Sequence, residues 1–283
     1  MWNGNRDSFL ACAAEYEDAK IVLFGAPFDG TTSFRPGARF APRVIRTDSY
    51  GLETYSPRQH KDLTALFIFD GGDLELPFGN PQKALTFIEK YISRLLRDGK
   101  IPFMLGGEHL VTLGAIRAAE KKYPNLRVLH LDAHTDLRDE YLGEKLSHAT
   151  VMRRVWERVG DGRIVQVGLR SGEKEEFDFA RAHTVLHECN KREWSEITDQ
   201  LSGEPLYVSL DLDILDPSIF PGTGTPEPGG ISFSDLQKTV MQMSGLNIVG
   251  CDVVELSPPY DPSGISAAAA CKIVRELLLV IGG

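Results

Sequence analysis

The sequence has 283 residues, of which 42% are hydrophobic and 25% charged, as is typical of a globular protein with a large core. Its formal net charge of −9 weighs against nucleic acid as a partner, because phosphate binding needs clustered Lys and Arg. No apolar run reaches membrane-spanning length, and the N-terminus lacks the pattern of a signal peptide. The four cysteines are scattered without a CxxC pair, so we expect reduced thiols in a cytoplasmic protein.

Short apolar runs rich in Val, Ile, Leu and Phe predict strands. In chain order they cover residues 21–27, 65–70, 101–107, 127–133, 163–169, 184–188, 205–213 and 247–256. Segments with helical spacing lie between most of them, at 81–98, 110–122, 148–159, 232–243 and 264–281. This alternation predicts βαβ units and a mostly parallel sheet, and runs without polar alternation indicate helices on both faces. We therefore expect a single three-layer α/β/α domain over residues 1–283, with about eight strands and an N-terminal extension over residues 1–20.

Ionisable side chains follow the predicted strand at 127–133. In "LHLDAHTD", Asp132, His134 and Asp136 stand at alternate positions. In an extended chain such positions point to one side, so the three converge if the strand continues through residue 136. A helix cap or an ordinary loop hydrogen bond would explain one aspartate. Three ionisable groups in this pattern favour a site instead.

Two other predicted strand ends carry polar residues of the same kind. Asp211 and Asp213 end "VSLDLD", and two carboxylates this close would repel unless a cation lay between them. In "FMLGGEHLVT", two glycines permit a tight turn, and we expect Glu108 and His109 to start the next helix. Alone, this histidine would be a cap or core residue. Beside two carboxylate-rich strand ends it becomes a candidate ligand, because sites in open parallel sheets gather at the carboxyl ends of strands.

The charges of these residues indicate a binuclear metal site. The candidate ligands are four carboxylates and two imidazoles: His109, Asp132, His134, Asp136, Asp211 and Asp213. Two divalent cations would neutralise four carboxylates, and oxygen and nitrogen ligands without thiolate favour Mn²⁺ over a structural zinc. A two-metal site can activate water as hydroxide, so a hydrolytic reaction is expected.

Several motifs together resemble the ureohydrolase family, which contains arginases and agmatinases. "GGEH", "DAHTD" and "SLDLDILDP…GTGTPEPGG" resemble its three metal signatures, and "GAPFDGTTSFRPGARFAPRVIR", "SHAT", "VGLRSGEKEEF" and "DVVELSPPYDPSGISAAAA" agree in the same order. The resemblance runs from about residue 20 to the end of the chain. It implies an arginase-like fold, two Mn²⁺ per subunit held by the six residues above, and a homotrimer or homohexamer. The implied reaction is attack of metal-bridging hydroxide on a guanidinium carbon, which releases urea and an amine.

The resemblance also assigns two further site residues. His148, in "SHAT", matches the family's proton-shuttle histidine, and Glu255, in "DVVEL", matches the acid that holds the substrate guanidinium. Without the family match, His148 would be a histidine at a helix terminus and Glu255 a surface residue facing a helix. We expect Asp216 and Thr225 either to shape the loop or to contact and support the site residues.

The segment between Asp136 and Thr150 bears on the substrate. It lacks the asparagine-bearing loop with which arginases recognise an α-amino acid, and it carries acids instead: Asp139, Glu140 and Glu144. These acids favour agmatine, which has a cation at each end, although Arg138 and Lys145 could pair with a carboxylate. Three acids downstream are further candidates for binding the distal amine: Glu173, Glu175 and Glu176.

The segment looks most like those of bacterial and archaeal agmatinases. We therefore expect agmatine to be hydrolysed to putrescine and urea, a step of polyamine biosynthesis. Other ureohydrolase activities stay open at this point: guanidinobutyrase, guanidinopropionase, arginase and formimidoylglutamase. A metal-binding subunit without turnover is a third reading, against which the complete ligand set, His148 and Glu255 all argue.

Overall fold

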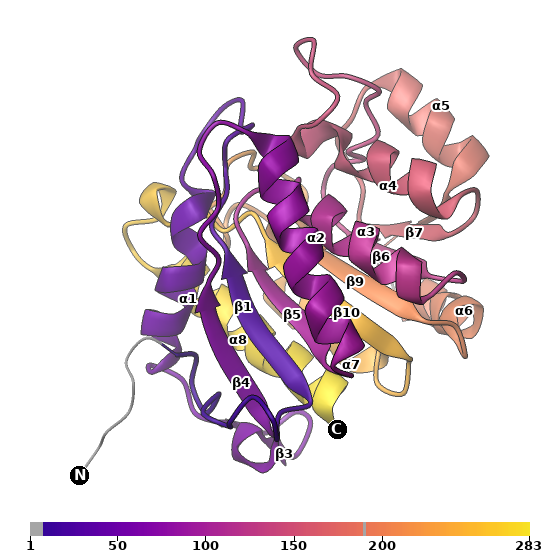
Figure 1. The fold of residues 1–283 in the computed structure, drawn as a ribbon. Helices are drawn as coiled ribbons and strands as arrows, with labels where there is room; N and C mark the ends of the chain where they lie inside the picture. The colour runs from indigo at the N-terminus through magenta and orange to yellow at the C-terminus, as the bar shows by residue number, and fades with distance from the viewer. Residues whose placement is uncertain (1–7, 189–190) are drawn as a thin grey trace.

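The centre of the molecule is an eight-stranded sheet (Figure 1). The computed structural model describes residues 8–188 and 191–283, so that Cys189 and residues 1–7 of the expected extension lie outside the described residues. The strands are β1 (Ile21–Ala26), β4 (Ile68–Asp73), β5 (Ile101–Gly106), β6 (Arg127–Leu131), β7 (Ile164–Val167), β8 (Val185–His187), β9 (Leu206–Asp211) and β10 (Ile248–Val254). Their order across the sheet is β4-β1-β5-β10-β9-β6-β7-β8, and every neighbouring pair is parallel. The strands β2 (Tyr55–Ser56) and β3 (Lys61–Asp62) form a separate antiparallel hairpin.

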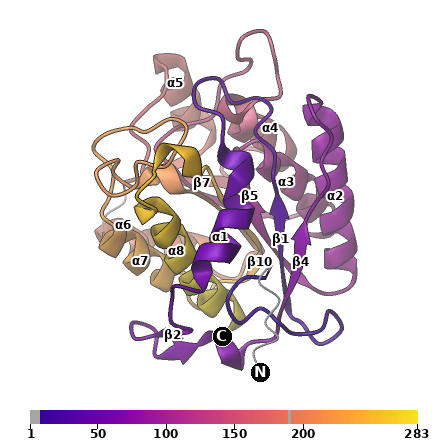
Figure 2. The ribbon, with the colours of Figure 1, turned by 90° about the vertical axis from the view of Figure 1, so that its left-hand side faces the viewer.

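Helices cover both faces of the sheet, as Figures 1 and 2 show. One layer contains α2 (Pro81–Arg97), α3 (Val111–Lys122), α4 (Val151–Val159) and α5 (Lys174–His183). The other contains α1 (Ala41–Ser49), α6 (Lys191–Leu201), α7 (Phe233–Gln242) and α8 (Ile265–Gly282). The expected three-layer α/β/α fold is therefore confirmed, with a sheet that is parallel throughout.

Each face of the sheet has its own hydrophobic core. Leu23 and Val208 pack into the core under α1, α7 and α8, whereas their neighbours Val22 and Tyr207 pack into the core under α2 and α3. All residues of β1 and β9 are buried. Both faces of these strands need apolar side chains, which explains why the apolar runs in the sequence show no polar alternation.

Three helices were not expected from the sequence. In α1 the buried positions include Arg46 and Ser49, and α5 buries only Glu176 and Ala180, so neither helix has a continuous apolar stripe. The third is α6. Two expected helix starts were also wrong. The helix α3 begins at Val111 rather than at Glu108, and α4 begins at Val151 after a 3₁₀ turn, His148–Thr150.

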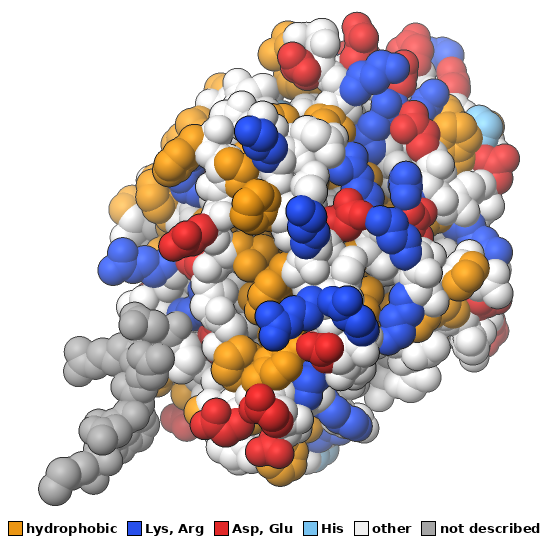
Figure 3. Space-filling view, in the orientation of Figure 1, with side chains coloured by type: hydrophobic (Ala, Val, Ile, Leu, Met, Phe, Trp, Pro, Cys, Tyr) orange, Lys and Arg blue, Asp and Glu red, His pale blue; other side chains and the backbone are white. Residues whose placement is uncertain are grey.

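The sequence also led to predictions about membrane spans, surface charge and the N-terminal segment. Among the described residues, no helix has the length and apolar character that crossing a membrane requires. On the face shown in Figure 3, basic side chains are interspersed with acidic ones. Phe9 and Cys12, within the expected N-terminal extension, are buried in the core. The single domain over residues 1–283 stays a prediction, as does the expectation that nucleic acid is not a partner.

A buried ion pair fastens α1 to the edge strand β4. Arg46 donates from Nε and Nη2 to the two carboxylate oxygens of Asp70, with a distance of 2.9 Å from Nε to Oδ2, and also pairs with Asp73. The side chains of Arg46 and Asp70 are 5% and 1% exposed. The charge of Asp70 therefore has little access to water and depends on Arg46 for compensation.

We expect Arg46→Ala to lower the free energy of unfolding by about 3–5 kcal/mol, because it leaves the carboxylate of Asp70 buried without its partner. Urea-induced unfolding followed by circular dichroism measures the loss. Arg43→Ala, on the exposed side of the same helix, is the control and should change the value by less than about 0.5 kcal/mol. Equal losses in the two variants would contradict the assigned role of the pair.

Candidate active site and metal centre

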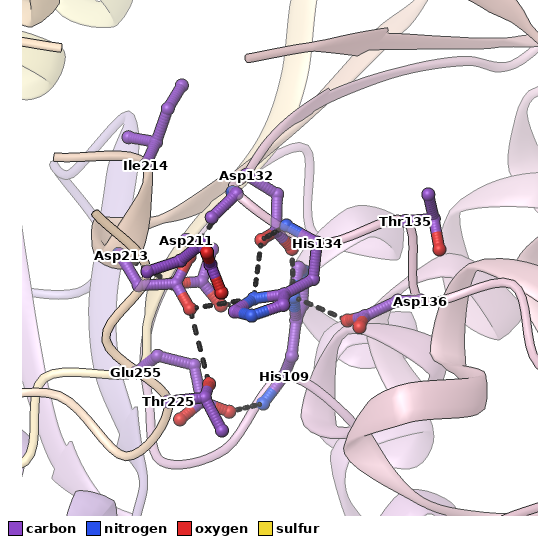
Figure 4. A network of polar contacts seen from close by, with 12 residues as sticks. His109, Asp132, His134, Thr135, Asp136, Asp211, Asp213, Ile214, Thr225 and Glu255 are labelled. Atoms are coloured by element: carbon purple, nitrogen blue, oxygen red, sulfur yellow. Dashed lines mark hydrogen bonds and ion pairs between the residues drawn. The ribbon is translucent and has the colours of Figure 1, made fainter. Parts of the chain in front are cut away.

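The strand order brings the predicted site residues together. The strands β5, β10, β9 and β6 are neighbours in the middle of the sheet, and Leu105, Val253, Leu210 and Leu131 are in register across it. Parallel strands end at the same edge, so the residues that follow them meet there. These residues are His109 after β5, Glu255 after β10, Asp211 and Asp213 at the end of β9, and Asp132, His134 and Asp136 after β6 (Figure 4).

His109 lies among three carboxylates. Its Nδ1 atom is 3.1 Å from Oδ2 of Asp132, 3.2 Å from Oδ2 of Asp136 and 3.3 Å from Oδ2 of Asp211. His109 and all three aspartates are buried, with Asp136 the most exposed at 8%. Three acids from two strand ends, β6 and β9, thus surround one imidazole nitrogen in the interior of the protein.

His134 forms the other half of the cluster. Its Nδ1 atom is 3.0 Å from Oδ2 of Asp213 and 3.5 Å from Oδ1 of Asp132, so Asp132 contacts both histidines. The backbone N–H of Asp213 donates to Oδ1 of Asp211 at 2.8 Å, which joins the two halves on the side of β9. All six residues predicted as metal ligands therefore lie in one cluster.

The cluster fits a pair of divalent cations. Burial, followed by the charges of Asp213 and Asp132, raises the pKa of the Asp211 carboxyl well above its ordinary value. In residues 8–188 and 191–283, no Lys or Arg forms an ion pair with any of the four aspartates, and Nδ1 of His109 is buried without a hydrogen-bond partner. An imidazole nitrogen without a hydrogen-bond partner, among carboxylates that pair with no Lys or Arg, provides donors for a divalent cation.

The backbone is strained at two of the site acids. Asp136 has φ 52° and Glu255 has φ 65°, a left-handed conformation that costs a non-glycine residue on the order of 1 kcal/mol or more. The three residues were expected to converge if the strand continued through residue 136, and this condition is not met, because β6 ends at Leu131 and Asp136 is in the left-handed region. The carboxylate of Asp136 nevertheless lies beside His109, and the carbonyl of Asp136 accepts from the N–H of Met152 at the start of α4.

A buried hydrogen-bond chain fixes the imidazole of His109. Oγ of Ser209 donates to Oδ1 of Asp252 at 2.7 Å and lies 2.9 Å from Nε2 of His109. Tyr207 donates to the other oxygen of Asp252. Because the hydroxyl proton of Ser209 is used on Asp252, Ser209 accepts from Nε2–H of His109. In the neutral imidazole that binds a metal, the unprotonated nitrogen is then Nδ1, which faces the cluster.

His148 is held at the cavity by the loop that follows β1. Its Nδ1 lies 3.0 Å from the carbonyl oxygen of Thr31, which can only accept, so Nδ1 carries the proton. Nε2 is then unprotonated, and it lies at the cavity, 3.3 Å from Oγ of Ser33. The buried carboxylate of Glu108 accepts from the N–H and hydroxyl of Thr31, at 2.9 and 2.5 Å. Glu108 thus fixes the loop that positions His148. Gly107 permits this close approach, since a Cβ there would overlap the carbonyl of Phe28.

These groups line one cavity of about 270 Å³. His109, His134, Asp136, Asp211, Asp213, His148 and Glu255 form its inner part, and Thr225 contacts Asp213 there at 3.4 Å. Asp216 instead accepts from the N–H groups of Gly229 and Gly230 and shapes the adjoining loop, as expected. The carboxylate of Glu255 accepts from the N–H of His109 at 2.7 Å, so it is fixed at the edge of the cluster.

The outer part of the cavity differs from what the sequence suggested. Of the expected acids, Glu173 and Glu176 line it, whereas Asp139, Glu140, Glu144 and Glu175 do not. Asp139 instead pairs with Arg154 at 2.6 Å. The acids that favour a cationic substrate are therefore those at the start of α5 and not those in the segment after Asp136.

A comparison with protein families agrees with this site. The model described as the arginase family matches residues 19–280. This chain belongs to the arginase family. The expected relationship to the ureohydrolases is thereby confirmed, and with it the expectation of an enzyme.

This chain is similar to several individual proteins along most of its length. It is 47% identical to the agmatinase of Bacillus subtilis over 277 residues, which cover 96% of this chain and 95% of that protein. It is 35% identical to the guanidinobutyrase of Pseudomonas aeruginosa, with 95% and 89% covered. The solved agmatine ureohydrolase of Thermoplasma volcanium superposes with a TM-score of 0.88 at 35% identity, with 97% of this chain and 94% of that chain covered.

Sequence reasoning missed several residues that support the arginase-family site. Ser209 stands two positions before Asp211, and His130 two positions before Asp132, so each shares a side of its strand with a site acid. Nε2 of His130 lies 2.8 Å from Asp132, and its Nδ1 lies 3.0 Å from the amide nitrogen of Gln166. His130 thus has partners on both nitrogens, which fits a role in orienting Asp132. Alternation extended back along the strand could have found both residues.

We expect Ser209→Ala to weaken Mn²⁺ binding by about 10- to 100-fold, because His109 loses the partner that fixes its ring and its protonated nitrogen. Calorimetric titration of Mn²⁺ into chelator-treated protein measures the affinity. Ser195→Ala, on the exposed side of α6, is the control and should bind Mn²⁺ like the unaltered protein. Unchanged affinity in Ser209→Ala would show that the chain from Asp252 does not support a metal ligand.

Proposed function

We propose that this chain is an agmatinase, which hydrolyses agmatine to putrescine and urea. The observation that carries the proposal is the convergence of a six-residue metal-type cluster, a histidine and a buried glutamate on one cavity. The agmatinases among its relatives support agmatine as the substrate. The guanidinobutyrase supports a second candidate, a guanidino acid with a carboxylate in place of the ammonium.

The cluster would hold two Mn²⁺ ions, with His109, Asp132, His134, Asp136, Asp211 and Asp213 as ligands. When bound, a pair of such ions lowers the pKa of a coordinated water and supplies hydroxide near neutral pH. The four carboxylates match the charge of two divalent cations, which supports this assignment. Their donor atoms, oxygen and imidazole nitrogen, support Mn²⁺ as the metal.

Glu255 would bind the guanidinium group of the substrate. Burial raises the pKa of its carboxyl to about 8 in the free protein, and a guanidinium at hydrogen-bond distance would favour the ionised form. One of its oxygens is occupied by the N–H of His109, which fixes the direction of the other. A planar guanidinium held in this way presents its carbon to the cluster.

His148 would transfer a proton from the attacking water to the leaving nitrogen. Burial lowers the pKa of its imidazole, so the ring is mostly neutral at pH 7 and Nε2 can accept a proton. The water oxygen adds to the guanidinium carbon, and the bond from that carbon to the alkyl-bearing nitrogen breaks. Nε2 takes one proton from the water and gives it to that nitrogen, which leaves as the primary amine. The carbon leaves as urea once the remaining hydroxyl proton has also passed to the amine.

We propose a cytoplasmic enzyme that acts as a homotrimer or homohexamer in polyamine biosynthesis. The three cysteines of the described residues are free and buried, which suits a reducing compartment. The resemblance to ureohydrolases supports the oligomer.

We expect agmatine to be the preferred substrate in a panel that also contains arginine, 4-guanidinobutyrate and 3-guanidinopropionate. Urea release is measured for each compound with Mn²⁺ supplied, and then after chelation and re-addition of the metal. Activity confined to a carboxylate-bearing compound would overturn agmatine as the substrate. Release of urea from none of them would overturn the proposed reaction and leave a formimidoylglutamase or a metal-binding subunit.

We expect His148→Ala to lower kcat for agmatine by about 10²- to 10⁴-fold with a much smaller change in KM, because the leaving nitrogen loses its proton donor. Steady-state urea release gives both constants. His60→Ala, an exposed position in the β2–β3 hairpin, is the control and should match the unaltered enzyme. Unchanged urea production in His148→Ala would show that another group carries the proton.

A further inference from the structure

An arginine with two acidic partners lies at the outer end of the cavity. Nη1 of Arg138 is 3.1 Å from Oε1 of Glu173, and its Nε is 3.4 Å from Oε2 of Glu176. The guanidinium carbon stands 4.8 Å from the centre of the Tyr141 ring. All four residues line the cavity that Glu255 and His148 share. Neither the metal cluster nor the proton transfer uses any of these four groups.

The two carboxylates hold Arg138 in different ways. Glu176 is buried and accepts from Oγ1 of Thr135 at 2.5 Å and from the N–H of Leu137 at 3.2 Å, so its position is set by the segment around Asp136. Glu173 has a side chain that is 57% exposed and is the N-cap residue of α5, where it can meet a ligand. Glu176 is therefore a fixed support, and Glu173 is the partner that a substrate can approach.

The charges at this end decide which group it accepts. Among the residues that line the cavity, Arg138 is the one Lys or Arg, and it faces two carboxylates, so this end carries a net negative charge. An ammonium group can bind Glu173 while Glu176 keeps Arg138. A carboxylate would have to displace Glu173 from Arg138 and remain beside both acids, which like-charge repulsion opposes.

We propose that Arg138 and Glu173 determine the specificity of the cavity for the end of the substrate distant from the guanidinium. Glu173 accepts a substrate ammonium and keeps Arg138 from binding a carboxylate. Removal of the charge of Glu173 would free Arg138 for a substrate carboxylate and turn the preference toward guanidino acids. The inference rests on the proposed ureohydrolase function and adds to it the residues that select the substrate.

The test compares agmatine with 4-guanidinobutyrate, whose distal ends carry an ammonium and a carboxylate. For Glu173→Gln we expect kcat/KM to fall about tenfold for agmatine and to rise about tenfold for 4-guanidinobutyrate, as suits one half-exposed charged contact. Both changes should lie in KM rather than in kcat, because the group is remote from the reacting carbon. Glu175→Gln, on the same helix but outside the cavity, is the control.

The double variant Glu173→Gln/Arg138→Gln tests the arginine itself. It should lose the gain toward 4-guanidinobutyrate, because the cation that binds the carboxylate is gone. In the slow His148→Ala background, calorimetry with the two compounds should give the same reversal in dissociation constants without turnover. If Glu173→Gln does not fold, Arg138→Gln alone should reduce 4-guanidinobutyrate binding further and leave agmatine binding intact.

Two outcomes would overturn the inference. One is an unchanged ratio of the two kcat/KM values in Glu173→Gln, and the other is a gain toward 4-guanidinobutyrate that persists in the double variant. Failure of the proposed function is a separate result, since the unaltered protein would then release no urea from either compound. An unaltered enzyme that prefers 4-guanidinobutyrate would mean that Arg138 already binds the carboxylate, which also overturns the inference.

Discussion

The mutual repulsion of four buried carboxylates is the constraint on which this structure depends. Asp132, Asp136, Asp211 and Asp213 come within a few ångströms of two imidazoles, where water screens their charges poorly. Such a group of acids is unfavourable in a folded core unless cations offset it. Metal binding would thus contribute to the stability of the folded protein as well as to its chemistry.

The fold meets this constraint by placing the acids on rigid supports. Each ligand segment starts from a central strand that is buried on both faces, so packing on either side fixes where the segment begins. The left-handed backbone at Asp136 and Glu255 then helps to orient their carboxylates. The energy of that strain is supplied by the packed cores, which is why an unfavourable backbone conformation can persist at the site.

The sequence predicted what local patterns determine. The eight strands and the six clustered ligands followed from apolar runs and from polar residues at their ends. The support of His148 did not, because Thr31 and Glu108 are distant in the chain and meet only when β1 lies beside β5. The positions of Asp139 and Glu173 relative to the cavity likewise depend on how two loops pack, which no local spacing encodes.

The inner and outer parts of the cavity are built from different kinds of structure. Strand ends carry the metal-type cluster and Glu255, so a change there disturbs the sheet itself. Arg138 and Tyr141 lie on a loop, and Glu173 lies at the start of a surface helix, where substitution affects few buried contacts. Relatives that share the reaction can therefore differ in the distal end of their substrates. This division is consistent with the similarity of this chain, over most of its length, to both an agmatinase and a guanidinobutyrase.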